Sequence, residues 1–281
     1  MFDIHSHVLP GLDDGPTRIQ ESLEMMRSAQ RAGVRAIVAT PHCESHRLSL
    51  RTSVIEGAVI RLRAAAADDP EASSVALHVG SEMMLDPGVR AALDAGDVPT
   101  LGGNTRFALV ELPMRWVPDY AEDALFELAA TGYVPVLAHP ERNHELSQRF
   151  DMMLRMIKRG ALMQLEAGSF VGAYGPIAQQ CAIDMIDRRM CHFIASDAHR
   201  PGAYDALIPH AIEAVAARIG REAADALFDT NPAAALAGER PVIAEPVFEE
   251  EWQQLRRGTT KAGRLKILPA KKWWGKQGSN L

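Results

Sequence analysis

Histidine and carboxylate side chains follow seven short apolar segments of this chain, at the point where each segment ends. The segments cover residues 2–4, 34–40, 75–80, 107–110, 134–138, 161–165 and 193–196, and their composition is typical of β-strands. The residues that follow them are His5 and His7, His42, Glu82, Glu111, His139, Glu166, and Asp197 with His199. Imidazole and carboxylate groups bind divalent cations and transfer protons, so the pattern indicates one hydrolytic site.

Helix-forming segments separate the strand-like segments. Apolar residues recur with helical period over residues 17–33, 53–67, 120–130, 150–159, 177–188, 204–219, 221–228 and 232–237. Strands that alternate with helices indicate β-α units with a parallel sheet, and seven such units come close to a β/α barrel. Because the C-terminal ends of barrel strands meet on one face, we expect the ionisable residues to share one pocket.

His5 and His7 lie two positions apart at the end of the first strand-like segment. This spacing directs both imidazoles to the same side of an extended chain, where one metal ion can take both. A lone His-x-His pair is equally often a surface pair beside a turn. The tight turn at Asp13 and Asp14 brings a carboxylate back to the same place, and we place Asp14 in the site with Asp13 as the alternative.

Glu82 and Glu111 occur within apolar surroundings at two further strand ends. A carboxylate in such surroundings is costly to bury unless a cation compensates its charge. Metal coordination meets this requirement, and an ion pair with Arg106 or Arg115 is the alternative.

Nine residues form the resulting set of candidate metal ligands. They are His5, His7, Asp14, His42, Glu82, Glu111, His139, Asp197 and His199. The set exceeds the three or four ligands that one zinc ion uses, and its composition suits a cluster of two or three Mn, Fe or Zn ions. Clustered metal ions favour phosphate ester hydrolysis, because they activate a bridging water and neutralise charge on the attacking and departing oxygens.

Arg142 is the main candidate for binding the phosphate group itself, because a guanidinium can contact two phosphate oxygens at once. A solvated arginine at the start of a helix is the alternative, and Arg200 is a weaker candidate for the same role. We expect Asp197 and His199 to act with Arg142 in catalysis. A cysteine nucleophile at Cys43 is not expected, because the chain has no Cys-x5-Arg phosphate-binding loop.

The chain of 281 residues, 47% of them hydrophobic, can bury one large core. We expect a catalytic domain over residues 1–240 and a connector with a basic, flexible tail over residues 241–281. Three cysteines without Cys-x-x-Cys spacing favour a cytoplasmic, reducing location over a disulfide framework. No apolar run reaches the length of a membrane span, and the N-terminus does not resemble a signal peptide.

The net charge of −6 is unevenly distributed along the chain. Residues 252–281 carry eight Lys or Arg and no Asp or Glu, so the rest of the chain is strongly acidic. An acidic body is poorly suited to binding a nucleic-acid backbone. In the tail, Trp252, Trp273 and Trp274 among basic residues permit docking to an anionic membrane surface or to an acidic kinase segment. A disordered, solubilising end is the alternative.

Several motifs of the chain resemble those of the PHP (polymerase and histidinol phosphatase) superfamily over roughly residues 1–240. Among its members, the chain is most similar to bacterial tyrosine-protein phosphatases of capsule and exopolysaccharide clusters. The motifs are Asp3-Ile-His-Ser-His7 with Leu12-Asp-Asp-Gly-Pro16, Thr40-Pro-His42, Gly80-Ser-Glu82, Ala138-His-Pro-Glu-Arg142 and Ala195-Ser-Asp-Ala-His199. Each motif is weak alone, and their occurrence in this order is specific.

The resemblance implies a distorted seven-stranded, TIM-like β/α barrel of the PHP type, with a trinuclear metal site at the C-terminal ends of the strands. It also implies a mechanism without a phosphocysteine intermediate, and a substrate that is the phosphotyrosine cluster of a tyrosine autokinase controlling polysaccharide polymerisation. Two features depart from the pattern. At Glu166 we would expect a neutral polar residue, and the basic tail has no counterpart.

Three hypotheses of function follow. In the leading one, a metal-dependent phosphatase uses metal-activated hydroxide, with manganese as the preferred metal, to attack phosphotyrosine while Arg142 steadies the transferring group. The second keeps the metals but changes the substrate to a small phosphate monoester such as histidinol phosphate, or to a nucleic-acid end. The third is a non-catalytic PHP module that binds polysaccharide machinery.

Overall fold

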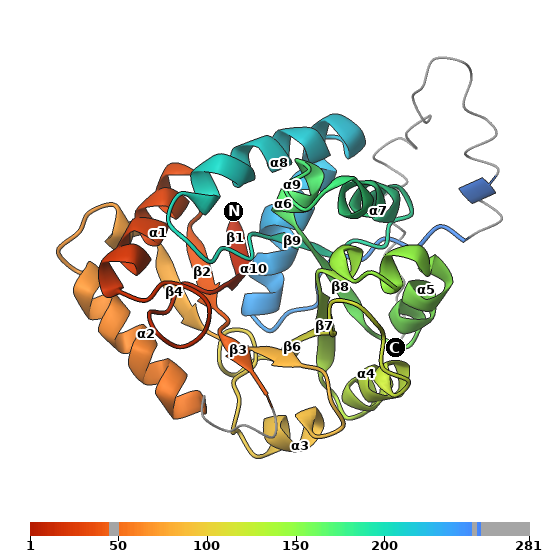
Figure 1. The fold of residues 1–281 in the computed structure, drawn as a ribbon, viewed down its shortest axis with the longest axis horizontal. Helices are drawn as coiled ribbons and strands as arrows, with labels where there is room; N and C mark the ends of the chain where they lie inside the picture. The colour runs from red at the N-terminus through yellow and green to blue at the C-terminus, as the bar shows by residue number, and fades with distance from the viewer. Residues whose placement is uncertain (45–50, 249–251, 254–281) are drawn as a thin grey trace.

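The computed structural model describes residues 1–44, 51–248 and 252–253, in which strands alternate with helices (Figure 1). The strands are β1 (Phe2–Ser6), β2 (Ala36–Ala39), β3 (His42–Cys43), β4 (Ala76–Val79), β5 (Glu82–Met84), β6 (Phe107–Glu111), β7 (Val134–Ala138), β8 (Leu162–Glu166) and β9 (Phe193–Ala195). The α-helices are α1 (Ile19–Arg31), α2 (Thr52–Ala66), α3 (Val89–Asp94), α4 (Ala121–Ala130), α5 (Phe150–Lys158), α6 (Ala167–Phe170), α7 (Pro176–Asp187), α8 (Ala203–Ile219), α9 (Arg221–Asp225) and α10 (Asn231–Leu236). Short turns of other helix types are η1 (Ala72–Ser74), η2 (Pro140–Arg142), η3 (Leu146–Gln148) and η4 (Ala226–Thr230).

The strands pair in parallel and form two sheets. One sheet has the order β1-β2-β4, and the other has the order β3-β5-β6-β7-β8-β9. The predicted α/β class with parallel strands is therefore confirmed. A single closed seven-stranded barrel is not observed over the described residues, because the chain continues beyond two of the seven predicted strand segments as a second short strand in the other sheet.

The second predicted segment, residues 34–40, contains β2 alone, and the chain continues beyond Thr40-Pro41 as β3. The amide of Thr40 donates a hydrogen bond to the carbonyl of Ser6 at 2.9 Å, beyond the end of β2. Pro41 has no amide hydrogen with which to continue a ladder. The chain leaves the smaller sheet here and enters the larger one as β3.

The third predicted segment, residues 75–80, contains β4 alone, and the chain continues beyond Gly80-Ser81 as β5. A Cβ atom at Gly80 would lie 2.6 Å from Cγ1 of Val38, so only glycine lets this backbone approach β2 so closely. Beyond these two breaks, His42 of β3 and Glu82 of β5 are direct register partners. The two breaks therefore place two of the predicted ligands side by side.

The first and last strands meet at their C-terminal ends. Ser6 and Ala198 form an isolated parallel bridge, and the amide of His7 donates to the carbonyl of Ala198 at 2.9 Å. The amide of Asp197 donates to the carbonyl of His5 at the same distance. Residues from the two ends of the domain are thereby held next to each other.

The inward faces of β6, β8 and β9 change from apolar to polar towards their C-terminal ends. Alternate residues of a strand share a face. The apolar members, buried in one core cluster, are Phe107 and Leu109, Leu162, and Phe193 and Ala195. The polar members that follow on the same alternation are Glu111, Gln164 with Glu166, and Asp197. The inward-facing residues of these strands therefore fill the core along most of their length and place ionisable side chains at their C-terminal ends.

Helices surround the strands, as Figure 1 shows for α1, α2, α4, α5, α7 and α8. Their apolar faces form a second core cluster with the outer faces of the strands, to which Met25, Leu125 and Met185 belong. These helices end within two residues of the segments expected from the sequence. Helix α3 was not expected, because six residues give too little periodicity to identify. Among the helices of the described residues, none has the length and hydropathy of a membrane span.

The described part of the C-terminal connector packs against the domain. The amide of Val247 donates to the carbonyl of Arg188 at 2.9 Å. Trp252 is 1% exposed, and its ring centroid lies 4.7 Å from the guanidinium carbon of Arg188. The hypothesis that Trp252 is an exposed docking residue is therefore wrong. The remaining tail, with Trp273 and Trp274, lies outside the described residues, and its docking role stays a prediction.

Replacing Gly80 by alanine tests the close approach of the two strand segments. Because the added Cβ must displace Val38, we expect the free energy of unfolding to fall by about 1–3 kcal/mol in denaturant titrations. Gly57→Ala is the matched control, because a Cβ there lies inside α2 and 3.4 Å from the flexible end of Arg61. It should leave stability unchanged or raise it by up to about 1 kcal/mol. Equal stability of the two variants would contradict the close packing.

Candidate metal centre

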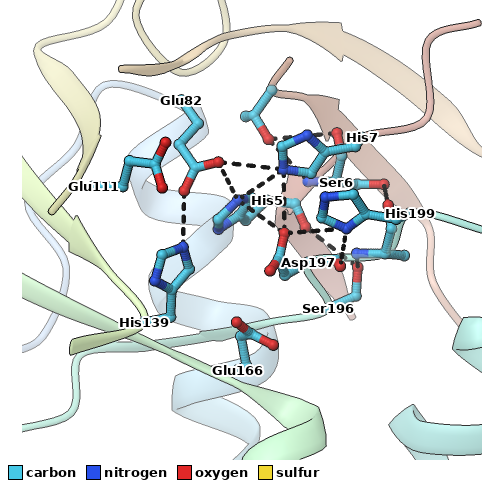
Figure 2. Close-up of polar contacts among 12 residues, drawn as sticks. His5, Ser6, His7, Glu82, Glu111, His139, Glu166, Ser196, Asp197 and His199 are labelled. Carbon is cyan, nitrogen blue, oxygen red and sulfur yellow. Dashed lines mark hydrogen bonds and ion pairs between the residues drawn. The ribbon is translucent and has the colours of Figure 1, made fainter. Parts of the chain in front are cut away.

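The nine predicted ligands meet at the C-terminal ends of the strands, and Figure 2 shows most of them pointing toward one another. They form four overlapping groups, and the ligand atoms within each group lie within 4.8 Å of one another. The groups are His7-Asp14-His42-His199, His5-His139-Asp197, His5-His7-Glu82 and His42-Glu82-Glu111. All nine residues belong to at least one group. Such overlap is the arrangement that closely spaced metal ions with shared ligands require.

Two carboxylate oxygens, Glu82 Oε2 and Asp197 Oδ1, occupy the centre of this cluster (Figure 2). Glu82 Oε2 lies 3.2 Å from His5 Nε2 and 3.3 Å from His7 Nε2. Asp197 Oδ1 lies 3.2 Å and 3.1 Å from the same two nitrogens. Both oxygens are buried, and neither makes a hydrogen bond among the described residues. Buried carboxylate oxygens that share imidazole neighbours without hydrogen bonds fit the ligand set of divalent cations.

Three histidines are oriented by oxygen atoms behind them. The contacts run from His5 Nδ1 to Gln164 Oε1 at 2.7 Å, from His7 Nδ1 to Asp13 Oδ2 at 2.7 Å, and from His199 Nδ1 to the Asp197 carbonyl at 2.9 Å. An acceptor at Nδ1 favours the tautomer with the proton on that nitrogen and leaves the Nε2 lone pair for a metal ion. The three imidazoles are therefore preset as Nε2 ligands.

The two aspartates of the turn after β1 make their shortest contacts with different histidines. Asp13 lies behind the imidazole of His7 and also accepts a hydrogen bond from the amide of His42 at 3.1 Å. Asp14 Oδ1 lies 3.2 Å from His199 Nε2 and 3.6 Å from His42 Nε2. Asp14 thus lies within the cluster, and Asp13 supports one of its members from outside.

Two residues of the cluster have backbones in the left-handed region, with φ of 35° at His139 and 49° at Asp197. Such conformations cost on the order of 1–3 kcal/mol each and persist where the surroundings enforce them. Next to Asp197, the carboxylate of Asp3 accepts hydrogen bonds from the Ser196 amide (2.9 Å), the Ser196 hydroxyl (2.6 Å) and the Tyr204 hydroxyl (2.7 Å). This buried network holds the chain in the conformation that directs Asp197 inward.

The imidazoles and carboxylates of the cluster shift one another's pKa values. Burial lowers the pKa of His42 and His139, but contacts with Glu82, and with Glu111 for His42, outweigh burial and raise both pKa values to about 10. Burial raises the pKa of Glu82, but the charge of His5 and contacts with His139 and His42 hold that pKa well below its usual value. Without a cation, protons on the imidazoles therefore compensate the carboxylates.

Arg142 lies at the edge of the cluster. Its Nη1 forms ion pairs with Glu166 and with Asp197, the latter at 3.2 Å. Its guanidinium carbon lies 4.1 Å from the ring centroid of Tyr174. Glu166, where a neutral residue was expected, is fully buried and compensates the charge of Arg142.

Gln164 and Glu141 contact the cluster or its neighbours but were not predicted to be functional residues. Gln164 precedes Glu166 by two positions, so the alternation of β8 could have placed it on the inward face. Glu141 is buried, and its Oε1 accepts hydrogen bonds from the Glu166 amide at 2.9 Å and from the Ser169 hydroxyl at 2.7 Å. It ties η2 to the end of β8, a contact for which the sequence carries no local signal.

Replacing Gln164 by leucine should weaken metal binding, because His5 loses the acceptor that fixes its tautomer. Loss of such an outer contact typically reduces metal affinity by about 10- to 100-fold. Competition with a chromophoric chelator measures this affinity for manganese. Gln148→Leu is the matched control, because Gln148 is exposed and its amide contacts the His144 carbonyl. Equal affinities of the two variants would show that Gln164 does not orient the ligand.

Metal binding should release protons and strengthen as pH rises. The raised pKa values of His42 and His139, about 10, mean that these imidazoles are protonated at neutral pH before a cation binds. A histidine ligand must be neutral, so the cation displaces the proton, and lowering the pH favours the protonated, metal-free protein. Calorimetry in two buffers with different ionisation enthalpies counts the released protons. Identical binding enthalpies in both buffers would refute the linkage.

Comparison with known proteins identifies relatives over most of the chain. The chain is 36% identical over 200 residues to the putative tyrosine-protein phosphatase CapC of Staphylococcus aureus, covering 71% of this chain and 77% of CapC. It is 34% identical over 201 residues to the tyrosine-protein phosphatase YwqE of Bacillus subtilis, with the same coverage of both chains.

A solved structure and a family model extend this similarity to the fold. A crystal structure described among those of YwqE from Bacillus subtilis and CpsB from Streptococcus pneumoniae, "unique metal-dependent tyrosine phosphatases", matches with a TM-score of 0.83 at 29% identity. The match covers 88% of this chain and 98% of the other. The family model for capsular polysaccharide synthesis proteins CpsB/CapC matches residues 1–237. This chain therefore belongs to the CpsB/CapC family of capsular polysaccharide synthesis proteins.

Proposed function

We propose that this protein is a metal-dependent protein-tyrosine phosphatase that acts on a tyrosine autokinase of capsule or exopolysaccharide synthesis. The observation that carries the proposal is the convergence of nine imidazole and carboxylate ligands, with Arg142 at their edge. Family membership and the names of the relatives, which are tyrosine-protein phosphatases, support the phosphotyrosine substrate.

We propose that two or three divalent cations bind to these nine residues, with manganese preferred and iron or zinc as alternatives. Bound there, such cations supply an activated water and neutralise negative charge on a phosphate ester. The central oxygens of Glu82 and Asp197, each close to several imidazole nitrogens, are suited to sharing between cations. The remaining ligands complete the coordination from the surrounding strand ends.

Arg142 is the fixed positive group for the phosphate. Both of its observed carboxylate contacts use Nη1, so Glu166 and Asp197 hold the guanidinium from one side. The opposite edge of the guanidinium can then meet two phosphate oxygens. The side chain of His199 is 28% exposed, so this ligand lies on the open side of the cluster, where a phosphate ester would enter.

A cysteine mechanism does not fit the structure. The cysteines Cys43, Cys181 and Cys191 are all buried, and none forms a disulfide bond among the described residues. Burial raises the pKa of Cys43, the nearest of them to the cluster, to about 12. A thiol with such a pKa supplies almost no thiolate nucleophile near neutral pH.

We also propose that the two sheets are parts of one distorted seven-stranded barrel of the PHP type. The continuity of β2 with β3 and of β4 with β5 along the chain supports this view. The bridge between Ser6 and Ala198 supports it as well, because it joins the outer strands of the two sheets.

The proposed activity predicts metal-dependent hydrolysis of a phosphotyrosyl peptide. The purified protein should release phosphate in the presence of manganese. Hydrolysis should stop when a chelator is added, because the chelator removes the cation that activates water. Side-by-side assays with histidinol phosphate and single-stranded DNA rank the competing substrates. Activity that survives complete metal removal would reject the mechanism, and faster turnover of histidinol phosphate would reject the substrate.

Replacing Arg142 by lysine tests the role of the guanidinium without leaving Glu166 uncompensated. Lysine keeps the charge but loses the two-oxygen contact, so we expect kcat/KM for the phosphopeptide to fall by about 100-fold. Bound metal, measured by elemental analysis, should not change. Arg149→Lys, at an exposed arginine that pairs with Glu145, is the matched control. Unchanged turnover in Arg142→Lys would remove Arg142 from phosphate binding.

A further inference from the structure

A cavity of about 370 Å³ opens beside Asp197 and His199. Its other walls come from the connection between α6 and α7, at Ala173 and Tyr174, and from residues 200–203, 206 and 207 around the start of α8. The lining thus combines the ionisable side chains of Asp197, His199 and Arg200 with small and apolar side chains.

Tyr174 is held rigidly in this lining. One face of its ring lies over the guanidinium of Arg142, at 4.1 Å. Burial, and then the nearby charge of Glu166, raise the pKa of its hydroxyl. A Cβ at Gly168 would lie 2.7 Å from Cε2 of Tyr174, so the glycine lets the ring lie directly against the backbone. Tyr174 is nevertheless 36% exposed, and it lines the cavity.

The buried carboxylate of Glu166 sets this arrangement. It forms an ion pair with Arg142, whose guanidinium stacks on the Tyr174 ring and lies 3.2 Å from Asp197. The Tyr174 ring is therefore separated from the metal-ligand candidates by one side chain. Because Arg142 stacks on a ring that lines the cavity, a phosphate group on Arg142 would lie next to this cavity.

We propose that Tyr174 is a specificity-determining residue that forms the wall against which the aromatic group of an aryl phosphate lies. This inference rests on the proposed function and adds to it the residue that distinguishes aryl from alkyl esters. An apolar space of about 150 Å³ holds a benzene ring, so the cavity has room for the ring and for the phosphate. A ring stacked on Tyr174 gains an aromatic contact that a phosphoserine side chain cannot make.

The length of the substrate side chain agrees with this geometry. Phosphotyrosine carries its phosphate beyond a complete ring, so the peptide backbone remains outside the cavity when the phosphate reaches Arg142. Pro201 and Ala206, both exposed, lie at this outer part of the cavity. A short alkyl phosphate would have to draw its backbone into the opening to reach the same guanidinium.

The test compares two non-hydrolysable ligands, phenylphosphonate and methylphosphonate, on the manganese-loaded, full-length protein by calorimetry. The wild-type protein should bind the phenyl compound more tightly. Tyr174→Leu should reduce this preference by roughly three- to tenfold, the range of one aromatic contact. Tyr174→Phe should retain it, because the ring is kept.

A matched control and a kinetic readout complete the experiment. The matched control is Tyr133, whose hydroxyl donates a hydrogen bond to Asp94 at 3.1 Å. Tyr133 precedes β7 and therefore lies at the end of the strand opposite to the cluster. Tyr133→Leu should leave the phenyl preference unchanged. In Tyr174→Leu, the ratio of kcat/KM for phosphotyrosyl over phosphoseryl peptides should fall by the same factor as the binding preference. Leaving-group reactivity cancels, because the same two substrates are compared in each protein.

The outcomes separate this inference from the proposed function. An unchanged phenyl preference in Tyr174→Leu overturns the inference. An equal loss in Tyr174→Phe also overturns it, because the effect would then arise from the hydroxyl and Glu166. Absence of phosphotyrosyl hydrolysis by the wild-type protein with every metal rejects the proposed function instead. An active wild-type enzyme without a phenyl preference rejects the inference alone.

Discussion

Compensation of buried carboxylates is the condition that the rest of this structure satisfies. A carboxylate without donors or cations is too costly to bury. Asp3 and Glu141 are compensated by hydroxyl groups and backbone amides, and Glu166 by a guanidinium. One oxygen each of Glu82, Asp197, Glu141 and Glu166 makes no hydrogen bond among the described residues. The oxygens of Glu82 and Asp197 lie at contact distance from imidazoles of the predicted ligand set, so a divalent cation would compensate these two carboxylates.

The irregular backbone at the strand ends follows from the same condition. Pro41 separates β2 from β3, and Gly80 separates β4 from β5, so each break precedes a strand that begins with a ligand. His139 and Asp197 have positive φ. A regular strand directs every second side chain to the same face at a fixed spacing, which cannot bring many ligands to one point. Local strain at functional sites is sustained by the surrounding packing. Near Asp197, the buried hydrogen bonds of Asp3 with Ser196 and Tyr204 provide this support.

The strand ends and most helices could be predicted from the sequence, because periodicity and the residue at a strand end are local signals. The division of the strands between two sheets could not, since it depends on the close approach of Gly80 to Val38. The pairing of Arg142 with Glu166 likewise joins residues that lie on different strand ends. The prediction for Trp252 was wrong for the same reason. The basic composition of its surroundings suggested an exposed tail, but a contact with Arg188, distant in the sequence, buries the side chain.

The meeting of the first and last strands has a consequence for biosynthesis. His5 and His7 leave the ribosome almost at once, whereas Asp197 and His199 emerge only after most of the domain has been translated. The amide and carbonyl contacts that hold these residues together form between the two ends of the domain. The proposed ligand set therefore cannot be complete on a nascent chain shorter than residue 199. A cation that needs the whole set would bind only after the two ends of the domain have met.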